Sequence, residues 1–241
     1  MENILVVENL TIAFGQLLAV NSLSIEVRQG EILGIIGPNG SGKTTLLNGI
    51  SGLYKPRTGR VIFQGTDITH YSPAKRCRLG IGRTYQVPRT FEKMTVYENV
   101  LVGGVYGASL SEKSARNKVY EILELTGLLP KKDLFAGKLA LLDRKRLEVA
   151  RALATHPKLL LLDEVAAGLT EAEVNEVLRI VKTVKESGVT IIWIEHILKT
   201  MMEAADRVLC IASGKKLACG EPKGVLDSKE VQEVYLGVEE L

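Results

Sequence analysis

Gly37-Pro38-Asn39-Gly40-Ser41-Gly42-Lys43-Thr44-Thr45 is the stretch that decides the fold of this chain. It fits the phosphate-loop pattern, in which two glycines flank four residues and Lys-Thr follows. Glycines let the backbone curl so that successive N–H groups point into one concavity, and a helix beginning near Gly42 adds the positive end of its dipole. Such a concavity binds an anion. We therefore expect Lys43 to reach the β- and γ-phosphates of a nucleotide and the Thr44 hydroxyl to bind Mg²⁺.

The residues on either side of this loop support a nucleotide site rather than a chance glycine-rich turn. Residues 31–36 are mostly apolar and predict a buried strand, and residues 45–50 predict a helix. Strand, loop and helix in this order are the context in which the motif binds phosphate.

Composition places the chain among ordinary soluble globular proteins. Its 241 residues can form one α/β domain, or a core with a small insert, and 46% of them are hydrophobic and 24% charged. A net charge of +3 gives no signal for nucleic-acid binding. No segment approaches the ~20 apolar residues that span a bilayer, and the first residues lack the basic start of a signal peptide. Cys77, Cys210 and Cys219 have no metal-ligand spacing, so we expect unpaired thiols in a reducing cytosol.

Hydrophobic periodicity predicts an α/β core that is interrupted by a helical insert and preceded by a β-rich portion. Strands are expected at residues 4–7, 22–27, 60–63, 158–163 and 189–194, the last two buried and parallel. The region 87–142 has helical character. Helices are expected after the capping-box patterns Ser109-Leu110-Ser111-Glu112 and Thr170-Glu171-Ala172-Glu173, ending at Gly127 and Gly188. Ser213-Gly214 predicts a hairpin turn.

Two carboxylates end the strand expected at 158–163. Strand C-termini are where open α/β sheets bind ligands. Asp163 is therefore expected to hold Mg²⁺, usually through water, and Glu164 to act as general base on an attacking water. The alternative is a pair of solvated carboxylates at a strand end.

His196 and Gln86 are functional candidates only because of the expected phosphate loop and the strand that ends at Asp163. His196 follows the strand at 189–194, which we expect beside the Asp163 strand, so that His196 contacts the γ-phosphate. A lone histidine is otherwise more often structural. Gln86 precedes Pro88, where regular structure ends and a hinge between core and helical insert is expected. Its amide is placed to sense Mg²⁺ or the attacking water.

These elements occur in the order and rough spacing of ABC-type ATPases, and the chain resembles the ATP-binding subunit of ABC transporters over essentially its whole length. The resemblance implies an α/β fold, with a P-loop NTPase (RecA-like) core, an N-terminal antiparallel β subdomain and an inserted helical subdomain within one domain, 1–241. The core and β subdomain would take residues 1–86 and 156–241, and the helical subdomain 87–155. ATP and Mg²⁺ are the implied cofactors.

The resemblance also implies a role for each site residue. Catalytic roles fall to Glu164, His196 and Gln86, and metal binding to Thr44, Gln86 and Asp163. Phe14 matches the aromatic position that stacks on adenine, a contact worth roughly 1–3 kcal/mol by analogy with bases on aromatic rings. A core phenylalanine is the alternative. The phosphates would be bound by Gly37, Asn39, Gly40, Ser41, Gly42, Lys43, Thr44 and Thr45.

Within the family, four stretches look like the branched-chain amino acid importers. They are Arg83-Thr84-Tyr85-Gln86-Val87-Pro88-Arg89-Thr90-Phe91, Met94-Thr95-Val96-Tyr97-Glu98-Asn99-Val100, Asp163-Glu164-Val165-Ala166-Ala167-Gly168-Leu169 and Val234-Tyr235-Leu236-Gly237. ATPases serving urea, amide or lipopolysaccharide transport look alike. The resemblance implies a cytoplasmic ATPase on the inner face of the cell membrane that powers transmembrane permease subunits. For the cations around Gln86 we favour a solvated face over contact with a partner or phospholipid heads: Arg76, Arg78, Arg83, Arg89 and Lys93.

The chain departs from the family at the signature motif. A Leu-Ser-Gly-Gly-Gln type sequence normally precedes the helix that leads to the Asp163 strand, and this slot reads Leu139-Ala140-Leu141-Leu142-Asp143. Ala140 has no hydroxyl, and a carboxylate ~4 Å from a phosphate charge costs roughly 4 kcal/mol at an effective dielectric of 20. We expect Asp143 to cap the following helix and point away from phosphate, with Arg144 and Lys145 offsetting its charge. Val165 and the slot Ala167-Gly168-Leu169-Thr170 also depart from the family's Pro and Asp.

The weak signature predicts a heterodimer. In the family this element faces the nucleotide held by the other subunit of a head-to-tail dimer. The chain's own ATP would then be hydrolysed against the intact signature of a second ABC ATPase subunit. The alternatives for this slot are an error in the register of the match and a nonstandard signature that still works.

Two other functions remain as alternatives to an importer ATPase. They are a soluble ABC ATPase scaffold of the iron–sulfur assembly type and a non-hydrolysing regulatory subunit, and Glu164 and His196 argue against the second.

Overall fold

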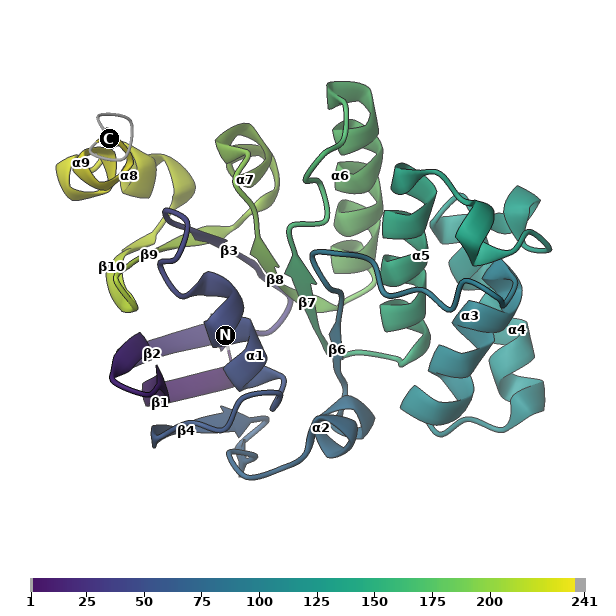
Figure 1. Cartoon of the computed structure of the whole chain (residues 1–241), viewed down its shortest axis with the longest axis horizontal. Coiled ribbons are helices and arrows are strands. Elements are labelled where there is room, and N and C mark those ends of the chain that lie inside the picture. Colours follow the sequence, from purple (N-terminus) through teal and green to yellow (C-terminus); the bar gives the residue numbers. More distant parts are fainter. Residues whose placement is uncertain (1, 237–241) are drawn as a thin grey trace. The chain divides into compact units, whose positions relative to one another are not determined.

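The computed structural model describes residues 2–236 (Figure 1). The chain divides into two compact units. We call Met1–Pro73 with Thr190–Leu241 the phosphate-loop unit, and Ala74–Val189 the helical unit. The division into 1–86 with 156–241 and 87–155 stays a prediction.

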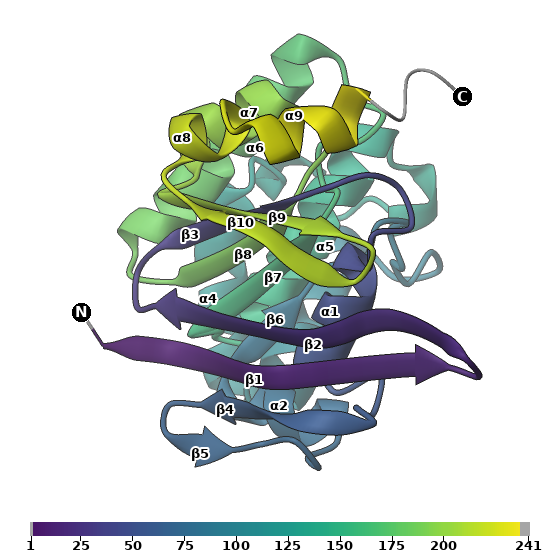
Figure 2. The same ribbon diagram turned by 90° about the vertical axis from the view of Figure 1, so that its left-hand side faces the viewer.

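An antiparallel sheet forms the N-terminal part of the phosphate-loop unit. Its strand order is β2-β1-β4-β5, with bounds β1 (Asn3–Phe14), β2 (Leu17–Arg28), β4 (Thr58–Phe63) and β5 (Thr66–Asp67) (Figure 2). The first two strands are longer than predicted, because register shifts along the β1–β2 pair let pairing continue from Asn3 to Phe14. Alternating side chains, such as Leu5 and Val7, are buried on one face.

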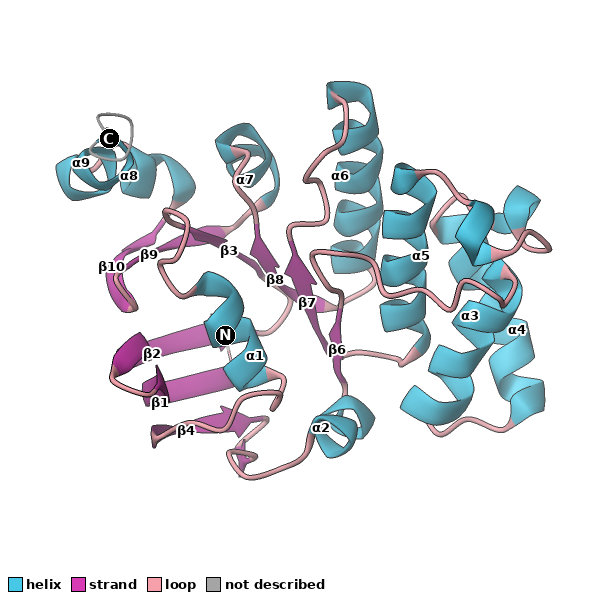
Figure 3. Cartoon of the chain, in the orientation of Figure 1, coloured by secondary structure: helices cyan, strands magenta, loops and turns pink. Residues whose placement is uncertain are grey.

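Parallel strands form the rest of the phosphate-loop unit. Strand β3 (Ile32–Ile36) lies between and parallel to β8 (Thr190–Ile194) and β9 (Arg207–Ala212), and β10 (Lys215–Gly220) pairs antiparallel with β9. Every residue of β3 and β8 is buried, as expected for strands covered on both faces. The helices are α1 (Lys43–Ile50), α7 (Leu198–Ala204), α8 (Pro222–Leu226) and α9 (Lys229–Leu236) (Figure 3). Gly237, the last residue of the matched C-terminal stretch, lies outside the described residues.

The hairpin predicted at Ser213-Gly214 is confirmed. It joins β9 to β10, and its two residues have φ of 48° and 75°. Positive φ at both central residues matches the right-handed twist of the flanking strands, which explains why glycine occupies the second position.

The helical unit packs helices around its own apolar core. Its strands are β6 (Ile81–Arg83) and β7 (Leu159–Asp163), and its helices α2 (Pro73–Leu79), α3 (Val96–Val102), η1 (Gly103–Gly107), α4 (Glu112–Leu125), η2 (Leu129–Lys131), η3 (Ala136–Lys138), α5 (Leu141–Ala154) and α6 (Glu171–Glu186). Helices α3, α4 and α5 contact one another (Figure 3) and bury Val100, Leu123 and Leu147 between them. The predicted buried strand and the predicted apolar face of α6 are confirmed. Helix α2 and strand β6 were not expected, because both are too short to show a clear period.

Three of the helix starts differ in how well the sequence predicted them. The capping box at Thr170 and Glu173 is confirmed. The box at Ser109–Glu112 is wrong: Ser111 is the N-cap and accepts from the Ser114 N–H, whereas Ser109 has φ of 55°, outside the extended conformation of an N-cap. A second full box, Thr95 with Glu98, was missed although its Thr-x-x-Glu spacing was visible.

All three cysteines are free, as predicted. Cys77 is half-buried, Cys219 is exposed, and Cys210 is buried in β9. Burial raises the pKa of the Cys210 thiol to about 11, so this group stays protonated at neutral pH. Among residues 2–236, no helix is both long enough and apolar enough to cross a membrane.

Candidate functional site

The glycine-rich loop between β3 and α1 has the conformation that only glycines allow. Gly37, Gly40 and Gly42 have φ of 146°, 77° and 104°, and α1 begins directly after Gly42, where its start was expected. A Cβ on Gly37 would lie 2.1 Å from the Ile211 carbonyl oxygen, and one on Gly42 would lie 2.2 Å from that of Ala19. Both close approaches are to backbone, so neither glycine can be replaced without moving the loop.

Polar groups inside this loop are arranged to receive an anion. The Lys43 side chain is 5% exposed, and its ammonium donates to the carbonyls of Gly37 at 2.7 Å and Pro38 at 3.0 Å. The buried Ser41 Oγ has no hydrogen-bond partner among residues 2–236. A buried hydroxyl without a partner costs about 1–3 kcal/mol, and an oxyanion in the loop would remove that cost. The loop therefore fits phosphate.

Mg²⁺ also fits the donor set near this loop. Within the described part of the chain, no three His, Cys, Asp or Glu side chains gather to hold a metal. Mg²⁺ needs no such cluster, because it keeps several waters and takes oxygens from phosphates beside one or two protein ligands. The half-buried Thr44, at the first turn of α1, carries one suitable hydroxyl.

Phe14 ends β1 with its ring in solvent. The side chain is 48% exposed, and its ring meets that of Tyr54 edge-on, with centroids 5.2 Å apart. The alternative of a core phenylalanine is wrong. An aromatic ring that is half exposed to solvent can offer surface for stacking on a planar base.

His196 lies two residues beyond β8. Strand β8 pairs parallel with β3, with Ile194 opposite Ile35, so Gly37 and His196 both follow the carboxyl ends of neighbouring strands. The His196 side chain is exposed, and the backbone N–H of His196 donates to the Glu195 carboxylate at 3.3 Å. The strand beside β3 thus carries the histidine to the edge of the sheet from which the phosphate loop starts.

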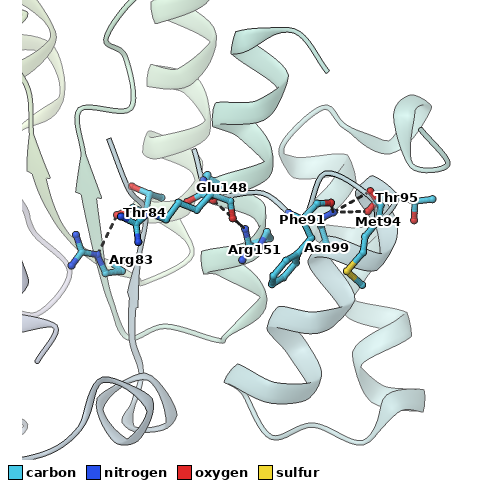
Figure 4. Close-up of polar contacts among 9 residues, drawn as sticks. Arg83, Thr84, Phe91, Met94, Thr95, Asn99, Glu148 and Arg151 are labelled. Carbon is cyan, nitrogen blue, oxygen red and sulfur yellow. Dashed lines mark hydrogen bonds and ion pairs between the residues drawn. The ribbon is translucent and has the colours of Figure 1, made fainter. Parts of the chain in front are cut away.

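In the helical unit, β6 and β7 bring a second set of polar groups to one sheet edge. Asp163 ends β7 and is 1% exposed. Its N–H donates to the Thr84 hydroxyl at 3.2 Å, and its carboxylate lies 3.8 Å from the Arg83 guanidinium. Arg83 also donates to the Thr84 carbonyl (Figure 4). Sequence reasoning missed both partners, because the parallel pairing of β6 with β7 sets them beside Asp163.

The basic residues around Gln86 are not all solvated, which corrects the favoured interpretation. Arg76 is 1% exposed, and the Arg83 side chain is 12% exposed. Two guanidiniums stack on the Tyr85 ring, with that of Arg83 4.5 Å and that of Arg89 4.6 Å from the ring centroid. Such cation–π stacking orders the chain on either side of Gln86.

Glu164 and Gln86 are in direct contact. The Gln86 amide nitrogen donates to the Glu164 carboxylate at 2.5 Å, although the residues are 78 positions apart. Glu164 is 8% exposed and has φ of 49°, a backbone conformation that costs of order 1–3 kcal/mol outside glycine. Such strain persists only where surrounding contacts hold it, and in this conformation the Glu164 carboxylate accepts from the Gln86 amide. A buried carboxylate that is held by an ordered donor is suited to accept a proton from a bound water.

Polar contacts fix both ends of the segment that follows Gln86 (Figure 4). The Arg89 N–H donates to the Glu148 carboxylate at 2.8 Å, and Arg151 pairs with the same carboxylate at 3.1 Å. Burial raises the pKa of Glu148, and the charge of Arg151 opposes that shift. At the other end, the Asn99 amide accepts from the Phe91 N–H at 2.9 Å and donates to the Phe91 carbonyl at 3.1 Å.

Asp143 does not cap helix α5, contrary to the prediction. The N-cap is Ala140, without a side-chain hydrogen bond, and Asp143 lies in the first turn. Its carboxylate, 5% exposed, pairs with Lys131 and with Arg146, the latter at 3.5 Å. The neutralising cations are therefore not Arg144 and Lys145. A buried carboxylate takes whichever cations the tertiary packing brings, and η2 supplies Lys131.

Replacing Asp143 with Ala should lower the free energy of unfolding by about 2 kcal/mol, because Arg146, mostly buried, loses a partner. Urea unfolding of the full chain measures this. The matched control is Asp133→Ala, since the Asp133 side chain is 82% exposed beside Lys132, and its loss should stay within about 0.5 kcal/mol. Equal unfolding free energies for the two variants would contradict a stabilising role for Asp143.

Comparisons with known proteins agree with this geometry. The family model described as ABC transporter matches residues 20–167. The high-affinity branched-chain amino acid transport ATP-binding protein LivG of Salmonella typhimurium is 36% identical, covering 97% of this chain and 98% of its own. The probable LivG of Archaeoglobus fulgidus is 38% identical, covering 98% and 96%. The crystal structure of the ADP conformation of MJ1267, an ATP-binding cassette of an ABC transporter, superposes with a TM-score of 0.91 at 36% identity, covering 98% of this chain and 100% of that one.

The predicted α/β cassette fold is confirmed by this structure, and the predicted resemblance by the two sequence relatives. A loop that can cradle phosphate, on a chain that matches ATP-binding cassettes along nearly all of its length, assigns it to one family. The chain belongs to the ATP-binding proteins of ABC transporters, which are ATPases.

Proposed function

We propose that this chain is the subunit that hydrolyses ATP to power an importer of branched-chain or related amino acids. The observation that carries the ATPase role is the glycine loop with the buried Lys43 ammonium and the partnerless Ser41 hydroxyl. The cargo is supported by the relatives named for branched-chain amino acid transport. The chain then works from the inner face of the cell membrane, in complex with transmembrane permease subunits.

The site residues take the following roles in this proposal. Phe14 stacks on adenine, and phosphate is bound by Gly37, Asn39, Gly40, Ser41, Gly42, Lys43, Thr44 and Thr45. Thr44, Asp163 and Gln86 would hold Mg²⁺, which supplies positive charge against the charge that develops on the phosphates. Glu164 takes the proton of the attacking water, and His196 donates to the terminal phosphate. The 2.5 Å contact of Gln86 with Glu164 supports their joint role.

We further propose that the nucleotide sites form with a second ABC ATPase subunit whose signature is intact. In this chain Leu139-Ala140-Leu141-Leu142-Asp143 lacks the hydroxyl and the glycine amides that would embrace a γ-phosphate. The salt bridges of Asp143 to Lys131 and Arg146 support a structural rather than a phosphate-binding part for this slot.

Turnover of the purified chain, alone and mixed with candidate partner ATPases, tests the pairing. The chain alone should turn over slowly and accelerate with the correct partner. Rapid turnover by the chain alone would mean that its own signature works and that no heterodimer is needed.

The cargo is tested by purifying the native complex and measuring uptake into vesicles that contain it. Co-purifying permease subunits and ATP-dependent uptake of leucine, isoleucine or valine are the expected results. Transport of urea, amides or lipopolysaccharide instead would contradict the proposed cargo of branched-chain amino acids. A complex without any membrane protein would favour the soluble scaffold.

A further inference from the structure

One buried lysine touches the main chain of both residues at the Gln86–Glu164 contact. Lys145 lies in the second turn of α5 and is 4% exposed. Its ammonium donates to the Glu164 carbonyl at 2.8 Å and to the Gln86 carbonyl at 3.3 Å. Gln86 and Glu164 are themselves joined through their side chains at 2.5 Å. Three residues from three separate segments therefore hold one another.

Such a lysine is costly to bury, which argues for a specific task. Taking an ammonium out of water costs several kcal/mol unless its hydrogen bonds are replaced. Here the replacements are backbone carbonyls at the end of β7 and in the segment after β6. The Glu164 carbonyl belongs to a residue with φ of 49°, and rotation of this backbone would turn its carboxylate as well. A hydrogen bond to that carbonyl therefore restrains the backbone from which the Glu164 side chain projects, while the Gln86 amide holds the carboxylate itself.

Helix α5 makes a second contact with the same segment one turn later. Glu148, three residues after Lys145, accepts from the Arg89 N–H at 2.8 Å. Residues three apart lie on one face of a helix. The face of α5 that carries Lys145 and Glu148 therefore holds the segment 86–89 at both ends, and the same helix begins inside the signature slot at Leu141.

We propose that Lys145 is a positioning residue for ATP hydrolysis. It sets the Glu164 carboxylate and the Gln86 amide in one arrangement, and it makes that arrangement depend on where the first turns of α5 lie. This inference rests on the proposed role of Glu164 as general base. Lys145 acts on the rate of hydrolysis through Glu164 and does not contribute to ATP affinity.

The test compares three substitutions in whichever assembly of the full chain turns over ATP. Lys145→Met removes the charge and the donors, Lys145→Gln keeps a shorter donor, and Lys145→Arg keeps a cation. We expect kcat to fall about 10- to 100-fold in Lys145→Met, since a displacement near 1 Å can cost that much. KM and the Kd for MgATP should change less than about twofold, a split that simple loss of stability would not produce. Lys145→Arg should recover most of the rate, with Lys145→Gln between.

Two controls make the outcome decisive. Lys182→Met, at an exposed lysine of α6, should leave kcat and KM as in wild type. Adding Lys145→Met to Glu164→Gln should cause no further loss, because residues that act through one another are not additive. If Lys145→Met does not fold, Lys145→Gln carries the same comparison.

The results separate this inference from the proposed function. Wild-type kcat in Lys145→Met or Lys145→Gln would overturn the positioning role while Glu164→Gln still loses turnover. An equal loss in kcat and in ATP affinity would also overturn it. Full turnover in Glu164→Gln would instead refute Glu164 as the base, and with it the proposed route through which Lys145 acts.

Discussion

Glu164→Gln should retain ATP binding and lose turnover by about 10²- to 10⁴-fold, the range that a general base contributes. The substitution keeps the size of the side chain and an oxygen that can accept from the Gln86 amide. The backbone contact with Lys145 uses the main-chain carbonyl and is unchanged. The variant lacks the carboxylate that can take a proton from water. Phosphate release under saturating MgATP measures the rate, and calorimetry measures the affinity.

A matched variant separates loss of the base from loss of charge in the helical unit. Glu186→Gln, at the exposed end of α6, removes the same charge far along the chain and should leave turnover within twofold of wild type. Glu164→Gln with undiminished phosphate release would show that another group activates the water. A fall in ATP affinity as large as the fall in rate would show that Glu164 supports binding instead.

Lys43→Ala should raise the Kd for MgATP by more than about 100-fold. The ammonium is buried in the phosphate loop, where it donates to the Gly37 and Pro38 carbonyls, and phosphate oxygens would exchange for such contacts. Hydrogen bonds to charged groups are worth about 1.5–3 kcal/mol each, and two of them correspond to more than two orders of magnitude in affinity. Calorimetric titration of the purified chain with ATP in the presence of Mg²⁺ measures the change.

The control for this variant is Lys55→Ala, at an exposed lysine of the same unit. It should bind ATP like the wild-type chain. Equal heats of ATP binding in Lys43→Ala and Lys55→Ala would show that the phosphate loop does not grip the nucleotide. In that case the proposed role as the ATP-hydrolysing subunit of an importer would lose its support, even though the relatives are named as ATP-binding proteins.

Local chemistry makes several features of this protein predictable from its sequence. The start of α1 at the phosphate loop, the turn at Ser213-Gly214 and the capping box at Thr170 each depend on neighbours within a few residues. Glycine is needed where φ is positive, and a cap needs one side-chain acceptor at a set spacing. The buried strand that ends at Asp163 is equally clear from its unbroken apolar run.

Contacts between residues that are far apart in the sequence could not be predicted in this way. Asp143 carries a pattern typical of a helix cap, yet Lys131 and Arg146 take its carboxylate. The sequence alone predicts Arg83 to be a solvated cation, and only the pairing of β6 with β7 places it beside Asp163. Nothing along the chain marks Lys145 as the donor to both Gln86 and Glu164.

Residue types and short spacings were thus enough to predict the glycine-rich strand–loop–helix, its order among the other motifs, and the candidate residues for phosphate binding and proton transfer. Which of those residues meet was settled by strand pairing and helix packing. The physical reason is that a backbone turn or cap forms from groups adjacent in the chain, whereas a buried ion must find its counter-charge wherever the folded chain brings one.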